Sequence, residues 1–280
     1  MAYIYENDPG PALAVPPGAC DTHMHFFEPG HAMAPDALIP PLQDARLDDY
    51  RKLQARLGLE RVVVVQPSTY GMDNACTMEA VAAIGENARA VVVVDSSNSD
   101  DELAELTKRG ARGIRFHMIA GGALPWEVVP ELSARVREHG WHSQLQLDGR
   151  QLPDRLGDIA AIAGQLVIDH VGRFFEPVDT GHAGFRALLE LVGKGAWVKL
   201  SAPYLTEAEG APEFERVGAL VKELINEAPE RMLWASNWPH PSIEPRPDDA
   251  VMLDTLLHWV EDEAVRNRIL VDNPAELYGF

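Results

Sequence analysis

The 280-residue chain carries 43 acidic and 24 basic side chains, and its net charge of −19 argues against nucleic acid and anionic membrane surfaces as partners. An apolar fraction of 46% is ordinary for a globular protein with a large core, and two cysteines are too few for a disulfide framework. Because no signal peptide and no apolar run of the ~20 residues that a membrane helix needs are recognisable, we expect a cytoplasmic protein.

Residues 1–17 are rich in proline and predict an irregular N-terminal arm. Behind the arm, short apolar runs alternate with segments of helical periodicity. The predicted strands cover residues 18–25, 61–67, 90–95, 111–117, 142–148, 165–170, 196–201 and 231–237. The predicted helices cover residues 47–57, 73–87, 100–109, 126–139, 152–163, 185–192, 214–226, 251–262 and 263–270.

This alternation predicts an α/β protein with a parallel sheet, and eight repeats predict a closed (β/α)8 TIM barrel, a single domain over residues 18–280. An open doubly wound sheet is the alternative. It is disfavoured because no glycine-rich phosphate-binding loop follows the first strand.

In such barrels the chemistry takes place at the carboxyl ends of the strands. The predicted strands end in polar residues, which are His23, His25, Gln66, Ser68, Asp95, Arg115, His117, Gln146, Asp148, Asp169, His170, Lys199, Ser201, Asn237 and His240. Structural polar residues are expected at helix caps and turns instead, so this convergence predicts an active site. His23 and His25 point to the same face of a strand, where they can bind a metal or substrate oxygens.

Three of these strand ends lie in motifs that resemble the amidohydrolase superfamily, namely Asp21-Thr-His-Met-His25, Ile168-Asp-His-Val-Gly-Arg173 and Trp234-Ala-Ser-Asn-Trp-Pro-His-Pro241. Further motifs, Gln66-Pro-Ser68, Asp73-Asn74, Arg112-Gly-Ile-Arg115 and Asn273-Pro-Ala-Glu-Leu-Tyr278, resemble the branch of pyrone-dicarboxylate lactonases and galactarolactone isomerases. The resemblance covers residues 18–280. Gly172-Arg-Phe-Phe175 and the Asn237-Trp-Pro-His240 motif favour the isomerases. The resemblance implies a metal-independent enzyme that acts on lactones.

The residues at the expected metal positions agree with that implication. A binuclear amidohydrolase site takes a lysine at the fourth strand, a histidine at the fifth and an aspartate at the eighth. This sequence has Arg115, Gln146 and Asn237 near those places. His23, His25 and His170 can in principle hold Zn²⁺, but the carboxylate that would take a proton from bound water is an amide. We therefore predict no metal and no other cofactor.

Asn237 has two open explanations. It either replaces the aspartate base of a lactonase and inactivates it, or it is native to a site that activates no water. In a lactone isomerase, a hydroxyl of the substrate attacks its own lactone carbonyl, and effective molarities of roughly 10⁵–10⁸ M replace much of the work of a base. His170, with a pKa near neutral pH, is predicted to move the proton.

The leading prediction is isomerisation of a hexaric (galactaro-type) acid lactone. The alternative is a lactonase for a pyrone-dicarboxylate or muconolactone ring, and a non-catalytic barrel that binds sugar acids or a protein partner stays open. The predicted catalytic residues are His23, His25, His170 and Asn237.

The substrate is predicted to be a small anion. Arg115 and Arg173 can grip a carboxylate in a bidentate manner, and Lys199 adds charge unless it pairs with a core carboxylate such as Asp169. The predicted substrate-binding residues are Ser68, Tyr70, Arg115, Gln146, Arg173, Lys199, Tyr204 and His240. Trp238 is expected to pack beneath the site. The sequence predicts no oligomeric state.

Overall fold

The computed structural model describes residues 5, 7–42, 45–241 and 243–280, so residues 1–4 and 6 of the predicted arm lie outside it. The described residues form one sheet whose eight strands follow chain order, each parallel to the next. The strands are β1 (Cys20–Met24), β2 (Arg61–Val65), β3 (Ala88–Val92), β4 (Ala111–His117), β5 (His142–Gln146), β6 (Leu166–Ile168), β7 (Trp197–Leu200) and β8 (Met232–Trp234).

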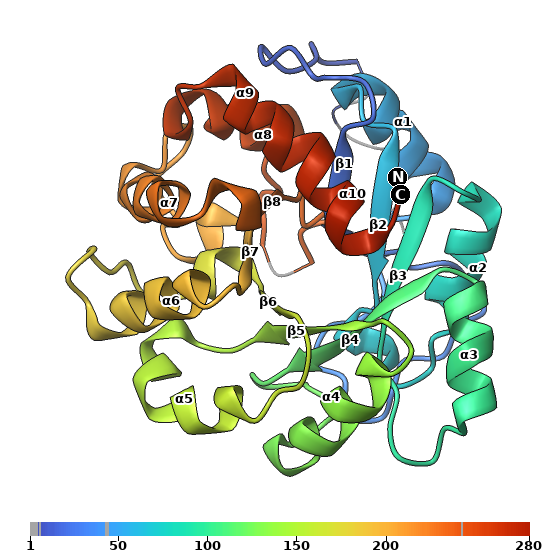
Figure 1. Ribbon diagram of the computed structural model, residues 1–280. Helices are drawn as coiled ribbons and strands as arrows, with labels where there is room; N and C mark the ends of the chain where they lie inside the picture. The colour runs from blue at the N-terminus through green and yellow to red at the C-terminus, as the bar shows by residue number, and fades with distance from the viewer. Residues whose placement is uncertain (1–4, 6, 43–44, 242) are drawn as a thin grey trace.

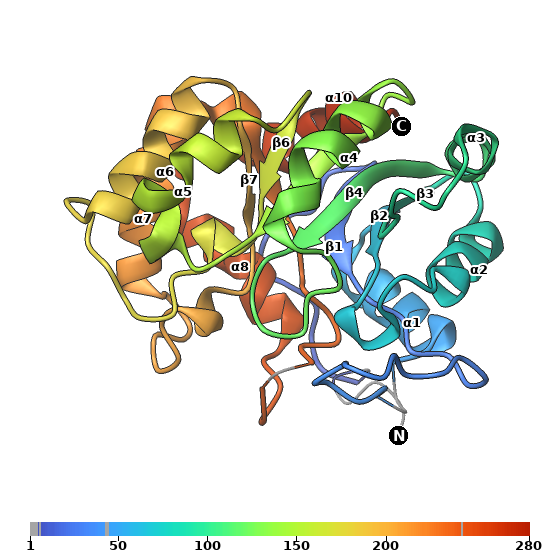
Figure 2. The ribbon, with the colours of Figure 1, turned by 90° about the horizontal axis from the view of Figure 1, so that it is seen from below.

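Helices follow the strands and surround them, as the view along the barrel in Figure 1 shows. The helices are α1 (Leu47–Leu57), α2 (Ala75–Ile84), α3 (Asp100–Lys108), α4 (Val129–Arg137), α5 (Leu152–Ala160), α6 (Ala183–Gly193), α7 (Glu215–Glu227), α8 (Asp249–Trp259), α9 (Glu263–Asn267) and α10 (Asn273–Tyr278). Figure 2 shows the same arrangement from below, at a right angle to Figure 1. No helix among the described residues has the length and apolar character needed to cross a membrane.

The barrel closes between β1 and the chain just after β8. The Asn237 amide donates to the His23 carbonyl at 2.9 Å, and the His25 amide donates to the Trp238 carbonyl at 2.9 Å. These bonds bring the first and last strands together and place two predicted site segments side by side. The predicted TIM barrel is confirmed.

The strand sequences explain the two parts of the core. In β2, Val62 and Val64 pack among the helices, whereas Val63 and Val65 point into the barrel, as a period of two requires. The interior cluster also contains Trp197 and Tyr278, and Tyr278 brings α10 against it. The Arg89 guanidinium donates to the Tyr278 carbonyl at 3.2 Å, which ties α10 to the start of β3.

Helix α1 begins and ends at the predicted residues, and its sequence shows why. Two aspartates in its first turn and Arg56 in its last turn complement the helix dipole, and Gly58 ends it with a left-handed φ of 74°. Other elements are shorter than predicted: α2 begins at Ala75 and ends at Ile84. The predicted 126–139 helix divides into a 3₁₀ turn (Trp126–Val128) and α4.

The strand ends differ most from the prediction, because β6 stops at Ile168 and β8 at Trp234. The chain then turns, and His170 and Asn237 adopt left-handed φ values of 53° and 62°. Such conformations are costly for residues other than glycine and concentrate at functional sites. Both side chains therefore belong to turns beyond the strands.

The C-terminal region was also predicted too simply. Instead of one helix over 263–270, the chain forms α9, a π-helical stretch (Arg268–Asp272) and α10. Upstream of β1, the described part of the predicted arm contains no helix or strand. Its Ala12 and Leu13 amides donate to the Asp254 carboxylate of α8, each at 2.9 Å.

Candidate active site

A cavity of about 210 Å³ opens at the carboxyl end of the barrel, between the loops that follow the strands. The predicted site residues that line it are His25, Ser68, Arg115, Gln146, His170, Arg173, Tyr204 and Asn237. Four predicted residues lie elsewhere, and these are His23, Tyr70, Lys199 and His240. The strand ends thus converge on one space, and a subset of their side chains faces it.

Two guanidinium groups give the cavity its positive charge. Arg115 is 5% exposed, and it donates to the Gln66 carbonyl at 2.7 Å and to Gln146 Oε1 at 2.9 Å. Arg173 donates one N–H to the Leu205 carbonyl at 2.9 Å. Because arginine stays charged in proteins, both remain cations on a strongly acidic chain. They can bind a carboxylate or an oxyanion in the cavity.

The structure sets the tautomer of His25. Its Nδ1 lies 2.8 Å from the Val65 carbonyl, which only accepts, so Nδ1–H donates and Nε2 keeps its lone pair. Burial, together with the charge of Arg115, lowers the pKa of His25 to about 3 and that of His117 to about 3. His25 is therefore a neutral acceptor at the cavity wall.

His170 hydrogen-bonds through Nδ1 to Ser201 Oγ at 2.8 Å. Burial holds the pKa of His170 well below 6.5; neighbouring His23 and Arg173 lower it further, while Asp169 opposes them. The near-neutral value predicted from the sequence is therefore wrong for the ligand-free protein, because the imidazole loses its hydration and stands beside cations. His170 is neutral and able to accept a proton.

Asn237, Tyr204 and His240 form a connected row that runs back from the cavity wall. Asn237 Nδ2 donates to the Tyr204 hydroxyl at 2.9 Å, and that hydroxyl lies 2.7 Å from His240 Nδ1. His240 Nε2 in turn lies 3.0 Å from Asp249 Oδ1. His240 is thus behind Tyr204 and reaches the cavity only through it.

Lys199 and His23 lie in a polar cluster inside the barrel. The Lys199 ammonium donates to the Thr22 carbonyl at 2.8 Å and to Gln144 Oε1 at 2.7 Å, and it lies 3.8 Å from Asp169 Oδ1. Burial lowers the pKa of Lys199 to about 8. The structure therefore favours the core pairing of Lys199 over its predicted contact with substrate.

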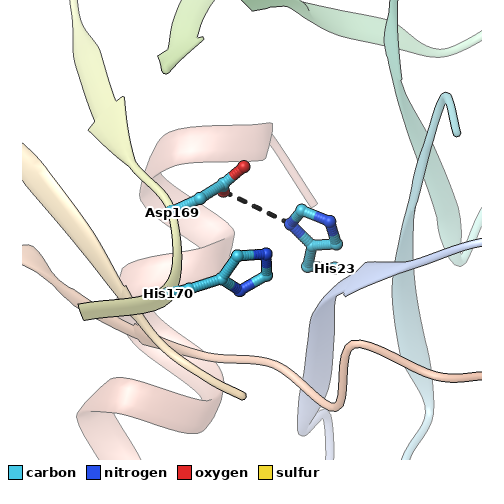
Figure 3. Close-up of side chains that lie close together, drawn as sticks. All are labelled: His23, Asp169 and His170. Atoms are coloured by element: carbon cyan, nitrogen blue, oxygen red, sulfur yellow. Dashed lines mark ion pairs between the residues drawn. The ribbon is translucent and has the colours of Figure 1, made fainter. Parts of the chain in front are cut away.

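The same cluster is where a metal could be held. His23, Asp169 and His170 bring one ligand atom each within 4.8 Å of one another, and Figure 3 shows the 3.3 Å pair between His23 Nδ1 and Asp169 Oδ1. The Lys199 ammonium stands 3.4 Å from the same His23 nitrogen. A dication bound there would be repelled by this charge in a site of low dielectric. The residues present do not fit a metal.

Tyr70 was predicted to bind substrate, but it does not line the cavity. Its ring is buried and packs 5.9 Å from Phe27 and 5.9 Å from His31, measured between ring centroids. Trp238 is buried in the core, with its ring centroid 5.3 Å from that of Tyr50 and 6.2 Å from that of Phe26.

Several lining residues were not predicted as site residues. His117 ends β4 and lines the cavity, which its place at a strand end could have indicated. Leu38 and Ile39 come from the long loop after β1 and supply an apolar wall. No periodic signal in that loop identifies them.

Comparison with known proteins decides the family. The amidohydrolase family model matches residues 20–280. The chain belongs to the amidohydrolase family. Within this family, it is 35% identical over 273 residues to D-galactarolactone isomerase of Agrobacterium fabrum, covering 96% of this chain and 93% of that protein. It is 30% identical over 288 residues to 2-pyrone-4,6-dicarboxylate hydrolase of Comamonas testosteroni, covering 98% and 94% of the two chains.

A solved structure shows the same fold over nearly the whole chain. The crystal structure of an Agrobacterium tumefaciens protein in its apo form has a TM-score of 0.93 and 34% sequence identity, covering 98% of each chain. The relatives named above are an isomerase and a hydrolase of lactones.

Proposed function

We propose that this protein is a metal-independent enzyme that isomerises the lactone of a hexaric acid by intramolecular acyl transfer. The observation that carries the proposal is Asn237, which lines the cavity where a hydrolase of this kind needs a carboxylate base. An amide has no useful basicity, so this position suits a reaction that activates no water. The likeness to D-galactarolactone isomerase supports the same reaction.

The substrate is held through charge. Arg173 lines the cavity with guanidinium N–H groups beyond the one given to Leu205, and it binds the free carboxylate of the lactone. Arg115, fixed between the Gln66 carbonyl and Gln146, faces the lactone carbonyl and stabilises the negative charge that develops on its oxygen.

The acyl transfer needs one proton carrier. A hydroxyl of the substrate attacks the lactone carbonyl, and its proton passes to His170 Nε2 as the new C–O bond forms. The old ring C–O bond then breaks, and the same proton passes to the departing ring oxygen, which leaves His170 neutral again. Asp169 stabilises the transient imidazolium, because its charge raises the pKa of His170.

The proposal includes the cytoplasmic location expected from the sequence. The two cysteines support it, since Cys20 and Cys76 are both free and buried. The proposed substrate is a small anion.

Proton NMR in heavy water tests the reaction. Purified protein treated with chelator is mixed with six- and five-membered galactaro- and glucaro-lactones, beside a protein-free control for spontaneous change. We expect the two ring forms to interconvert faster than in the control. Appearance of the open-chain acid alone would replace the isomerase with a lactonase. Ligand-induced thermal stabilisation without turnover of any lactone would indicate a binding protein.

A lactonase for a pyrone-dicarboxylate or muconolactone ring is the second candidate. The likeness to 2-pyrone-4,6-dicarboxylate hydrolase favours it. The variant Asn237→Asp separates the two functions. If hydrolysis of these lactones rises by orders of magnitude, the native chemistry is hydrolytic and Asn237 is an inactivating residue. If isomerisation falls without that gain, asparagine belongs at this position.

A further inference from the structure

Four buried side chains form a single row of hydrogen bonds that leads away from the cavity. The row runs from Asn237 through Tyr204 and His240 to Asp249, with successive distances of 2.9, 2.7 and 3.0 Å. Asp249 is 1% exposed, lies in the first turn of α8 and does not line the cavity. None of the proposed chemical steps uses it.

With a neutral imidazole at His240, the row has one consistent direction. A carboxylate accepts hydrogen bonds, so His240 Nε2–H donates to Asp249. A neutral imidazole then has its lone pair at Nδ1, and the Tyr204 hydroxyl must donate its proton there. The hydroxyl oxygen is left to accept, and it accepts from the Asn237 amide nitrogen. Each donor thus meets one acceptor from α8 to the cavity.

This direction decides which end of the Asn237 amide faces the substrate. The nitrogen is committed to Tyr204, and the carbonyl oxygen Oδ1 receives no hydrogen bond from any residue that the structure describes. Asn237 lines the cavity, so its free acceptor is available to a ligand there. If the row ran the other way, the amide would turn and offer a donor.

We propose that Asp249 is a positioning residue that, through His240 and Tyr204, fixes Asn237 as a hydrogen-bond acceptor for a substrate hydroxyl. The inference rests on the proposed function and sharpens its substrate class. An acceptor in the wall selects a lactone that carries hydroxyl groups, as sugar-acid lactones do. A pyrone dicarboxylate offers only oxygen acceptors, which would face the Asn237 oxygen without a proton between them.

The first test measures the tautomer of His240 without any substrate. Nitrogen-15 NMR of histidine-labelled protein distinguishes Nε2–H from Nδ1–H, and the His240→Asn variant assigns the signal by its loss. We expect Nε2–H in the natural protein. Observation of Nδ1–H would overturn the proposal. Because no turnover is needed, this result stands even if the protein converts no lactone, which would instead contradict the proposed function.

The second test is a double-mutant cycle on lactone turnover. Asp249→Leu removes the acceptor, and we expect kcat to fall about tenfold while KM changes less than about threefold. Tyr204→Phe interrupts the row between His240 and Asn237. In that background, Asp249→Leu should lower kcat by less than about twofold, because nothing remains to transmit its effect. Additive losses would show that Asp249 is merely structural.

Two further variants control the cycle. Asp249→Asn keeps a carbonyl acceptor for His240, so it should retain the Nε2–H tautomer and most of the kcat. Asp254→Asn changes another carboxylate of α8, one that binds the Ala12 and Leu13 amides, and should leave the His240 tautomer unchanged. Asp249→Leu should lose the Nε2–H tautomer. If Asp254→Asn loses it as well, the effect is one of helix stability and the proposal is overturned.

Discussion

Two histidine-rich regions lie side by side in the barrel and differ in what occupies their centre. At the cavity wall, His25 and His170 border open space. One layer deeper, His23 lies 4.9 Å from the His25 ring and 4.8 Å from the His170 ring, yet it is packed against Asp169 and Lys199. Similar side chains thus border a cavity in one layer, whereas in the next the Lys199 ammonium lies beside His23 and Asp169.

In the metal-independent enzyme that we propose, this contrast shows which groups take the place of an ion. In the deeper layer, Lys199 supplies a fixed positive charge beside Asp169, so the carboxylate is paired without a metal. In the upper layer, Arg115 places a positive charge at the cavity wall. Variants in each layer test these separate roles of Lys199 and Arg115.

Removal of the Arg115 cation from the cavity should have the largest effect. We expect Arg115→Gln to lower kcat/KM about a thousandfold, or about 4 kcal/mol, since it loses charge-assisted bonds to the substrate and leaves the Gln66 carbonyl unpaired. Steady-state kinetics measure the loss. Arg150→Gln is the matched control, because Arg150 pairs with Asp148 outside the cavity. A loss below tenfold would contradict the assigned role.

Both histidine layers should make the fold sensitive to acid. The pKa values of His25, His117 and His142 are lowered to about 3, and those of His23 and His170 lie well below 6.5, all through burial first. Below pH 6.5 the unfolded chain therefore binds protons that the folded chain does not. As the pH decreases, the free energy of unfolding therefore decreases by about 1.4 kcal/mol per pH unit for each such proton.

One buried carboxylate acts against this trend. Burial raises the pKa of Asp21 to about 6, so the folded chain takes up that proton first as pH falls from about 6 to 3.8. One group opposes five, and the net expectation is a steep loss of stability from pH 6.5 toward pH 3. Urea unfolding at several pH values measures it. A free energy of unfolding that is constant between about pH 6.5 and 5 would contradict the burial of neutral histidines.

Removal of the Lys199 ammonium should allow the deeper layer to bind a metal ion. We expect Lys199→Met to lower the free energy of unfolding by about 3 kcal/mol, because Asp169 loses its buried cation. Zn²⁺ should then raise the Tm of the variant, reversibly with chelator, and leave the natural protein unchanged. Lys194→Met on the surface is the control. An equal response of natural protein and variant to Zn²⁺ would refute the role given to Lys199.

The smallest effect is expected outside the cavity. Tyr70→Phe should change kcat/KM by less than about threefold, because its ring packs on the lining residue Phe27 and does not itself line the cavity. Tyr204→Phe, which alters a residue in the wall, should cost at least about tenfold. Parallel kinetics of the two variants compare them directly. Comparable losses would mean that Tyr70 reaches the substrate after all.

The fold was predictable because its signals are local. A continuous valine run such as β2 predicts a buried strand. The charges in the first and last turns of α1, with the glycine that follows it, predict a helix with those ends. The strand ends that form the site could be predicted from the sequence. Which of their side chains face the cavity, and which lie one layer deeper, could be predicted less well. Whether a side chain reaches the cavity depends on how far along the strand it lies, and Lys199 stands one residue before the end of β7.

Other features of the site depend on contacts that sequence patterns do not encode. The register of β1 against β2 shifts between Asp21 and Met24, so the depths of His23 and His25 do not follow from simple alternation. The left-handed turns at His170 and Asn237 lie beyond the ends of β6 and β8, although these residues were predicted to belong to the strands. The role of Asp249 appears only once α8 is packed behind the wall.

Elemental analysis combined with an activity assay after chelation tests the central claim most directly. We predict less than about 0.1 zinc per chain and an unchanged rate of lactone conversion after exhaustive treatment with chelator, because Lys199 supplies the charge beside His23 and Asp169. About one zinc per chain, with activity lost on chelation and regained when zinc is added, would contradict this account.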